Sequence, residues 1–203
     1  MSNIRFLVVL LTALAMPLIS EAKDASEYGK LVAALKSGDT KIDYGRLRLS
    51  YVESPERKQA TDTSAEEKAM SQELQAKDFA GALKHAEAVL DSEYVNLDAH
   101  FVAFIADREL GNTSKAEFHR TVFRGLVDSI RNSGDGKSPE KAWVIISVHE
   151  EYVVLRAMGL RPSGQSLMGK NGHMYDVMKA KGEDGKEETF YFNTDIPMKN
   201  EKF

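Results

Sequence analysis

The spacing of apolar side chains changes near residue 134, and this change constrains the fold more than any other feature of the sequence. Between Tyr28 and Ile130, apolar residues recur every three or four positions, which is the period of an amphipathic helix. Beyond Gly134 the pattern becomes short β-branched and aromatic runs separated by turn signals. We therefore predict an α+β fold with antiparallel helical hairpins over residues 23–137. These pack on a small, mostly antiparallel sheet with one helix over residues 138–203.

Local signals predict where several helices begin. Asp43 and Asp78 each precede an apolar stripe, and each carboxylate can accept a hydrogen bond from the first helical turn. Two segments, Ser64–Glu67 and Ser114–Glu117, match the capping box in which a serine and a glutamate satisfy each other's backbone donors. The polar segment Glu56–Thr63 shows no periodicity, and we predict a loop there.

The helices of residues 64–132 resemble tetratricopeptide hairpins. Asp78–Leu83 followed by Asn96–Ala99 looks like the second helix of one repeat leading into the first helix of the next. The helix starts at Phe79 and Lys115 are 115 − 79 = 36 positions apart, close to the tetratricopeptide period of about 34. Since about three repeats are needed to bury a core, two repeats require a further packing surface. We expect the C-terminal region to supply that surface.

The mixed part contains three kinds of signal. β-branched and aromatic runs predict strands, an apolar stripe that ends at a glycine predicts a helix, and an Asn-Gly pair predicts a hairpin turn. In chain order these are a strand at Trp143–Ile146, a helix at Glu150–Met158, a strand at Gln165–Met168, a turn at Asn171-Gly172, and strands at His173–Lys179 and Thr189–Asn193.

The first 22 residues have the pattern of a secretory signal peptide. Arg5 precedes the apolar run Phe6–Met16, and Ser20 and Ala22 place small residues before a predicted cut after Ala22. The run is shorter than the roughly 20 residues of a membrane-spanning helix, although an uncleaved anchor is an alternative. We therefore predict a secreted or periplasmic protein without an integral membrane segment after cleavage.

Composition and failed motifs exclude several functions. The net charge of −4 argues against nucleic-acid binding, and the absence of cysteine excludes thiol nucleophiles and cysteine-ligated metals. A phosphate-binding loop would need glycine where Arg131 stands, and a zinc-protease motif starting at His149 would need histidine where Val153 stands. Gly164–Met168 lacks the closing glycine of a hydrolase nucleophile elbow. We predict no cofactor, and the sequence leaves the oligomeric state open.

The candidate site residues are Glu150, His173, Asp176 and Asp195. A histidine with carboxylates could bind a divalent cation or act as an acid–base pair. In a strand, however, His173 and Asp176 fall on opposite faces because side chains alternate. The alternative is structural: His173 completes the hairpin, Asp176 accepts hydrogen bonds at a solvated edge, and Glu150 meets the positive end of a helix dipole.

Several spaced motifs together resemble an uncharacterised bacterial family, domain of unknown function 4919. They are Asp43-Tyr44, Leu47-Arg48, Tyr51, Ser54-Pro55, Ser133–Glu140, Ile146–Val148, Glu150–Tyr152, Leu155-Arg156, Gly172-His173, Tyr175–Val177 and Phe192–Pro197. The resemblance covers nearly all of the chain after the predicted signal. It implies an exported protein, helical and then mixed, with no activity or catalytic residues to transfer.

These observations favour an exported, non-catalytic binding module that engages a protein partner or an envelope component. The predicted helical hairpins support this hypothesis because such repeats present concave binding surfaces. One alternative is a metal-dependent or acid–base enzyme that uses the C-terminal His/Asp cluster. The other is a periplasmic immunity protein that blocks a toxic effector.

Overall fold

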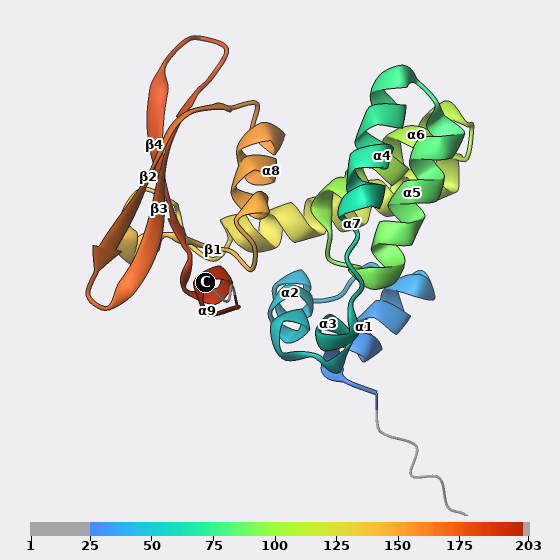
Figure 1. Ribbon diagram of the computed structural model, residues 1–203, viewed down its shortest axis with the longest axis horizontal. Coiled ribbons are helices and arrows are strands. Elements are labelled where there is room, and N and C mark those ends of the chain that lie inside the picture. The colour runs from blue at the N-terminus through green and yellow to red at the C-terminus, as the bar shows by residue number, and fades with distance from the viewer. Residues whose placement is uncertain (1–24, 201–203) are drawn as a thin grey trace, which may run out of the picture.

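The computed structural model describes residues 25–200, so the predicted signal peptide and its cut after Ala22 lie outside the described residues. The chain is α+β, as predicted (Figure 1). The helices of the N-terminal part are α1 (Glu27–Lys36), α2 (Tyr44–Glu53), α3 (Pro55–Gln59), α4 (Ser64–Ala76), α5 (Phe79–Ser92), α6 (Leu97–Glu109) and α7 (Thr113–Arg131). The C-terminal elements are the short 3-10 helix η1 (Pro139–Lys141), β1 (Trp143–Val144), α8 (His149–Ala157), β2 (Arg161–Lys170), β3 (His173–Lys181), β4 (Glu187–Asn193) and α9 (Asp195–Asn200).

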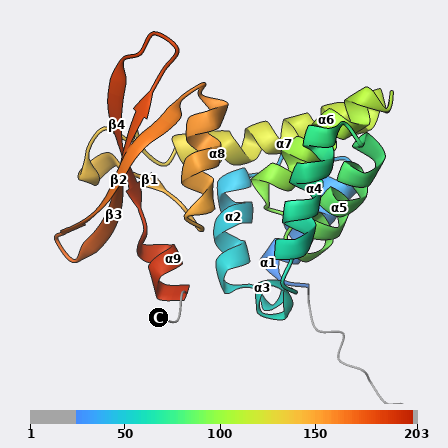
Figure 2. The same cartoon turned by 45° about the horizontal axis from the view of Figure 1, so that its top comes forward.

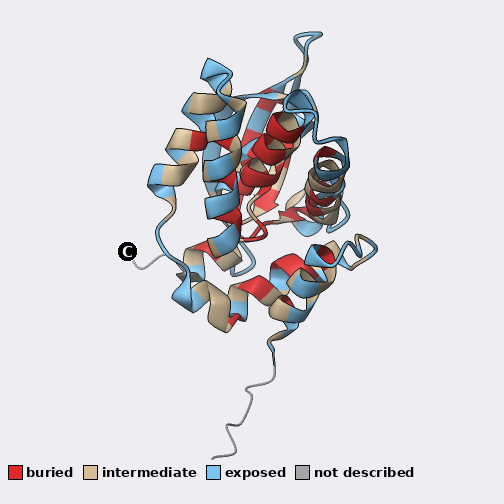
Figure 3. Cartoon of the chain, turned by 90° about the vertical axis from the view of Figure 1, so that its right-hand side faces the viewer, coloured by how far each residue is buried: buried red, intermediate tan, exposed pale blue. Residues whose placement is uncertain are grey.

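Consecutive helices α4, α5, α6 and α7 pack against one another, and α7 runs from this helical layer to the sheet (Figures 1 and 2). Helix α8 lies between the sheet and the helical layer, so the hairpins reach the sheet mainly through α7 and α8. The buried side chains form one core cluster that includes residues from both parts, and Figure 3 colours the buried positions red along the chain. The predicted C-terminal helix corresponds to α8, and the region also contains α9, which the sequence did not predict. Asp195 in its first turn suits a helix N-terminus.

The predicted aspartate caps are confirmed and the predicted capping boxes are wrong. Asp43 accepts from the Arg46 N–H at 2.9 Å and Asp78 from the Gly81 N–H at 3.0 Å. Ser64 is instead the first residue of α4, and its hydroxyl donates to Asp62 at 2.5 Å, so this hydroxyl is not available to cap. Helix α7 begins one residue before the second predicted box, after an Asn112 cap position.

The first part of the predicted loop over residues 56–63 belongs to helix α3, which begins at Pro55 and ends at Gln59. Pro55 occupies the first turn, where its missing N–H costs nothing, and the Ser54 hydroxyl accepts from the Arg57 N–H at 3.1 Å. A proline at the first position and a serine cap start a helix without an apolar stripe, which is why periodicity did not reveal it.

Within residues 25–200 the sheet has four strands in the order β1-β4-β3-β2, with β1 parallel to β4 and the other pairs antiparallel. The Asn171-Gly172 turn is confirmed: both residues have positive φ (55° and 81°), as a two-residue hairpin turn requires. Strand β1 is shorter than the predicted strand because the Ile146 N–H donates to Glu150 Oε2 at 2.8 Å. Among the described residues, no helix combines the length and apolar character of a membrane span.

The glycine-rich segment 133–138 has a structural role at the edge of the sheet. Gly136 accepts a hydrogen bond from the Tyr191 N–H of β4 at 2.9 Å, and the Gly134 carbonyl accepts from the Trp143 indole at 3.2 Å. Gly136 has a φ of 68°, which a residue with a side chain rarely adopts. The segment therefore ties the end of α7 to β4 and holds Trp143 in place, which explains a Gly-Lys-Ser run outside any phosphate-binding context.

We expect Gly134→Ala to destabilise the protein by about 2–3 kcal/mol, because its Cβ would collide with the backbone carbonyl of Lys141. Gly164→Ala in β2 is the matched control, since nothing lies nearer than 3.9 Å to the added Cβ. Urea denaturation of both variants measures the difference. Equal stability of the two variants would contradict this assignment of the loop.

Candidate functional site

The structure separates the four predicted site residues into three places. Glu150, at the start of α8, is buried and accepts two hydrogen bonds from Arg48 of α2, at 2.9 and 2.6 Å. Arg48 is 2% exposed and also donates to the Val144 carbonyl at 3.2 Å. Glu150 is therefore an ion-pair partner that joins α2, β1 and α8, and its part in a binding site stays a prediction. The structural alternative, in which Glu150 meets the positive end of a helix dipole, did not predict Arg48 as its partner.

Asp176 lies on the inner face of β3, opposite to His173, as the alternation of side chains predicts. Its carboxylate is buried and accepts from the Gln165 side-chain amide at 2.8 Å, so the expected solvated edge is wrong. Its other neighbour is Glu151 of α8, a fully buried residue whose Oε1 accepts no hydrogen bond from any described residue. Burial, and then the Asp176 carboxylate, raise the pKa of Glu151 to about 9. This shift favours the protonated carboxyl of Glu151 at neutral pH, and a hydrogen bond between the Glu151 and Asp176 side chains contributes to it.

His173 and Asp195 are brought together at the start of β3. His173 Nδ1 lies 2.5 Å from Asp195 Oδ2, while Asp195 Oδ1 accepts from the Met174 N–H at 2.9 Å. The His173 side chain is 55% exposed at the start of β3. This arrangement orients an imidazole on the surface. Among the described residues, however, no three histidine, aspartate or glutamate side chains are placed to hold a metal ion together.

A groove between α6, α7 and α8 combines aromatic and cationic side chains. Its volume is about 720 Å³, and Phe101, Phe104 and Phe123 form its apolar part. The Phe101 ring centroid lies 5.5 Å from that of Phe123 and 6.4 Å from that of Phe104. The other lining residues are Arg120, Arg124, Val127, Asp128, Arg131, Arg156 and Ala157. We call this surface the arginine groove.

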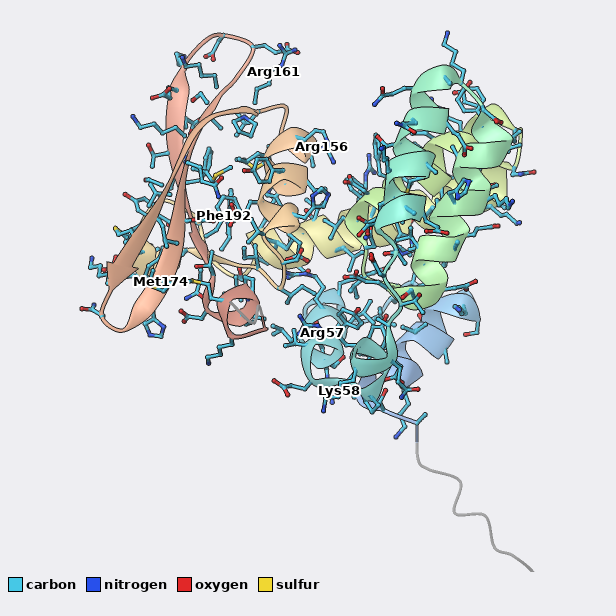
Figure 4. All side chains as sticks on the ribbon, in the orientation of Figure 1. Arg57, Lys58, Arg156, Arg161, Met174 and Phe192 are labelled. Carbon is cyan, nitrogen blue, oxygen red and sulfur yellow. The ribbon has the colours of Figure 1, made fainter. Side chains whose placement is uncertain are left out.

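Asp98 of α6 connects this helix to α8 beside the arginine groove. Its carboxylate pairs with Arg156 and accepts from His149 Nε2 at 2.5 Å, and both of these residues belong to α8. The hydrogen bond with Asp98 raises the pKa of His149. Figure 4 shows Arg156 on the side of α8 that faces the helical layer. A second pocket of about 430 Å³ lies between α4, α6 and α8 and shares Phe101 and Arg156 with the groove.

The periodicity of apolar residues alone does not reveal the arginine groove. It predicts the buried stripe of α7, whose members Val122, Leu126 and Ile130 are in the core. The arginines at 120, 124 and 131 recur with spacings of four and seven, which places them on one face of the same helix. That spacing was the available signal, although it could not show that Phe101, Phe104 and α8 lie beside this face.

Comparisons with known proteins identify a family. Residues 18–202 match the family described as Domain of unknown function (DUF4919). No curated protein and no solved structure matches the chain.

Proposed function

The chain belongs to the DUF4919 family, and since this membership assigns no activity, we propose from the geometry that it is an exported, non-catalytic binding module for a protein partner. The arginine groove is the single observation that carries the proposal. It combines partly buried phenylalanines with cationic side chains in a concavity of about 720 Å³ formed by three helices.

The composition of the groove suits protein recognition. Phenylalanine and arginine are both enriched at protein interfaces, because each can bury a large area while arginine keeps its hydrogen-bonding capacity. The tetratricopeptide resemblance remains a prediction, but a concave surface between packed helices is where such proteins bind their partners. The proposal does not depend on the repeat assignment.

Affinity capture from envelope extracts tests the binding function. The bait is the mature chain, compared with Phe104→Ala in the groove and with Leu110→Ala, which removes an apolar residue that is 44% exposed elsewhere on the surface. We expect the parent and Leu110→Ala to enrich the same protein and Phe104→Ala to lose it. Thermal melting confirms that both variants are folded. Retention of the partner by a folded Phe104→Ala would refute the groove as the binding site.

Export is tested separately. Mass spectrometry of the native protein should find Lys23 as its first residue if the predicted signal is removed. A chain that begins at Met1 would count against cleavage.

The His173–Asp195 pair favours a second candidate, an acid–base site. A carboxylate on Nδ1 orients an imidazole and leaves Nε2 available to a substrate. This candidate predicts that His173→Gln abolishes a turnover found by substrate screening while the melting temperature is unchanged. If a turnover is found and His173→Gln retains it, this candidate is wrong.

A further inference from the structure

We infer that the arginine groove recognises an acidic protein segment with an apolar anchor residue, an inference that rests on the binding function proposed above. Four arginines line the groove, while Asp128 is the single acidic residue among the lining residues described. The whole chain carries a net charge of −4, so this concentration of positive charge opposes the overall balance. A partner that brings negative charge would complement this surface.

The arginines of α7 are available to a partner. Arg124 is exposed and forms no ion pair with any described residue. Arg120 pairs with Glu117, and Arg131 lies 3.7 Å from Asp128, in each case three residues away on the exposed helix surface. Exposed pairs of this kind contribute about 0–1 kcal/mol, so a partner carboxylate can replace them at little cost.

The spacing of these arginines suits several carboxylates on one polypeptide. With a rise of about 1.5 Å per residue, Arg120, Arg124 and Arg131 extend over roughly 16 Å along α7. Each guanidinium can bind a carboxylate through two parallel hydrogen bonds. Across the groove, Arg156 already binds the Asp98 carboxylate, which shows that a carboxylate fits between α6 and α8.

The aromatic floor supplies the anchor site. Phe101, Phe104 and Phe123 are each only partly buried, so an inserted leucine or aromatic side chain would remove apolar surface from water. A concave floor between helices admits an inserted side chain. Such a concavity suits one inserted side chain better than a planar bilayer surface, and this favours a protein segment over an anionic membrane.

Fluorescence polarisation with labelled peptides tests this inference. The probe is a 12-residue peptide of aspartate and glutamate with one central phenylalanine, and the matched peptide has asparagine and glutamine in place of the acids. We expect the acidic peptide to bind at least 10-fold more tightly, and the difference to decrease in high salt. Equal affinity for the two peptides, no binding of either, or binding of anionic vesicles in place of the acidic peptide would overturn the inference.

Matched charge variants locate the interaction. Arg124→Glu should weaken binding of the acidic peptide at least 10-fold. Lys84→Glu makes the same charge change at an exposed position of α5 and should leave the affinity unchanged. An equal loss in both variants would assign the effect to net charge and refute the groove. The two proposals fail separately: if Phe104→Ala loses the captured partner but Arg124→Glu retains it, the binding function stands and the acidic-segment inference is wrong.

Discussion

Arg48→Met is expected to lower the free energy of unfolding by about 3–5 kcal/mol, because it leaves the buried Glu150 carboxylate without its guanidinium partner. Glu150 would then keep one backbone donor, the Ile146 N–H at 2.8 Å. Urea denaturation at pH 7 measures the loss.

Two further variants separate the charge from the packing. In Arg48→Met/Glu150→Gln neither of these two buried positions carries a charge, and the glutamine oxygen can still accept from the Ile146 N–H. Most of the lost stability should therefore return. Arg46→Met is the control, since it breaks the exposed pair with Glu27 and should cost less than about 1 kcal/mol. A double variant as unstable as Arg48→Met would show that the charge of Glu150 is not the cause.

Glu151→Gln is expected to remove a dependence of stability on pH. In the unfolded chain Glu151 ionises near its ordinary pKa of 4.5, whereas in the folded chain its pKa is about 9. Between these values the unfolded state has released a proton that the folded state retains, so stability decreases as pH rises. As pH rises through this window, the free energy of unfolding of the parent should decrease relative to that of Glu151→Gln by up to about 1.4 kcal/mol per pH unit.

The measurement is a series of urea denaturation curves between pH 5 and pH 9. The glutamine amide can donate to Asp176 as the protonated carboxyl does, so the variant should fold normally. Glu183→Gln is a control at an exposed glutamate and should follow the parent. Parallel stability profiles for the parent and Glu151→Gln would contradict a retained proton on Glu151.

The parts of the fold that the sequence predicted are those determined by neighbouring residues. The stripe of α5 and its Asp78 cap lie within one segment, and the Asn171-Gly172 turn requires only the backbone preferences of its own two residues. Strand β2 was predicted too short because it is an exposed edge strand, in which polar residues and glycine hide the alternation. Helix α3 was not predicted because its five residues, Pro55–Gln59, include no buried apolar side chain and so form no apolar stripe.

The candidate sites depend on residues far apart in the sequence, and local patterns could not bring them together. Arg48 and Glu150 are 102 positions apart, and Glu151 meets Asp176 only because α8 packs on the sheet. Side-chain alternation correctly separated Asp176 from His173, but it could not identify the new partner of either residue. The arginine groove likewise requires α6 and α8 beside α7.

Site-specific photo-crosslinking in intact cells tests most directly whether the arginine groove binds the partner. A photo-reactive amino acid replaces Asp128, which lines the groove without supplying positive charge, or, as a control, Lys179 on the outer face of β3, and mass spectrometry identifies the adducts. We expect one crosslinked protein from position 128, joined through a segment rich in aspartate and glutamate, and none from position 179. No adduct at 128, or the same adduct from both positions, would contradict the account.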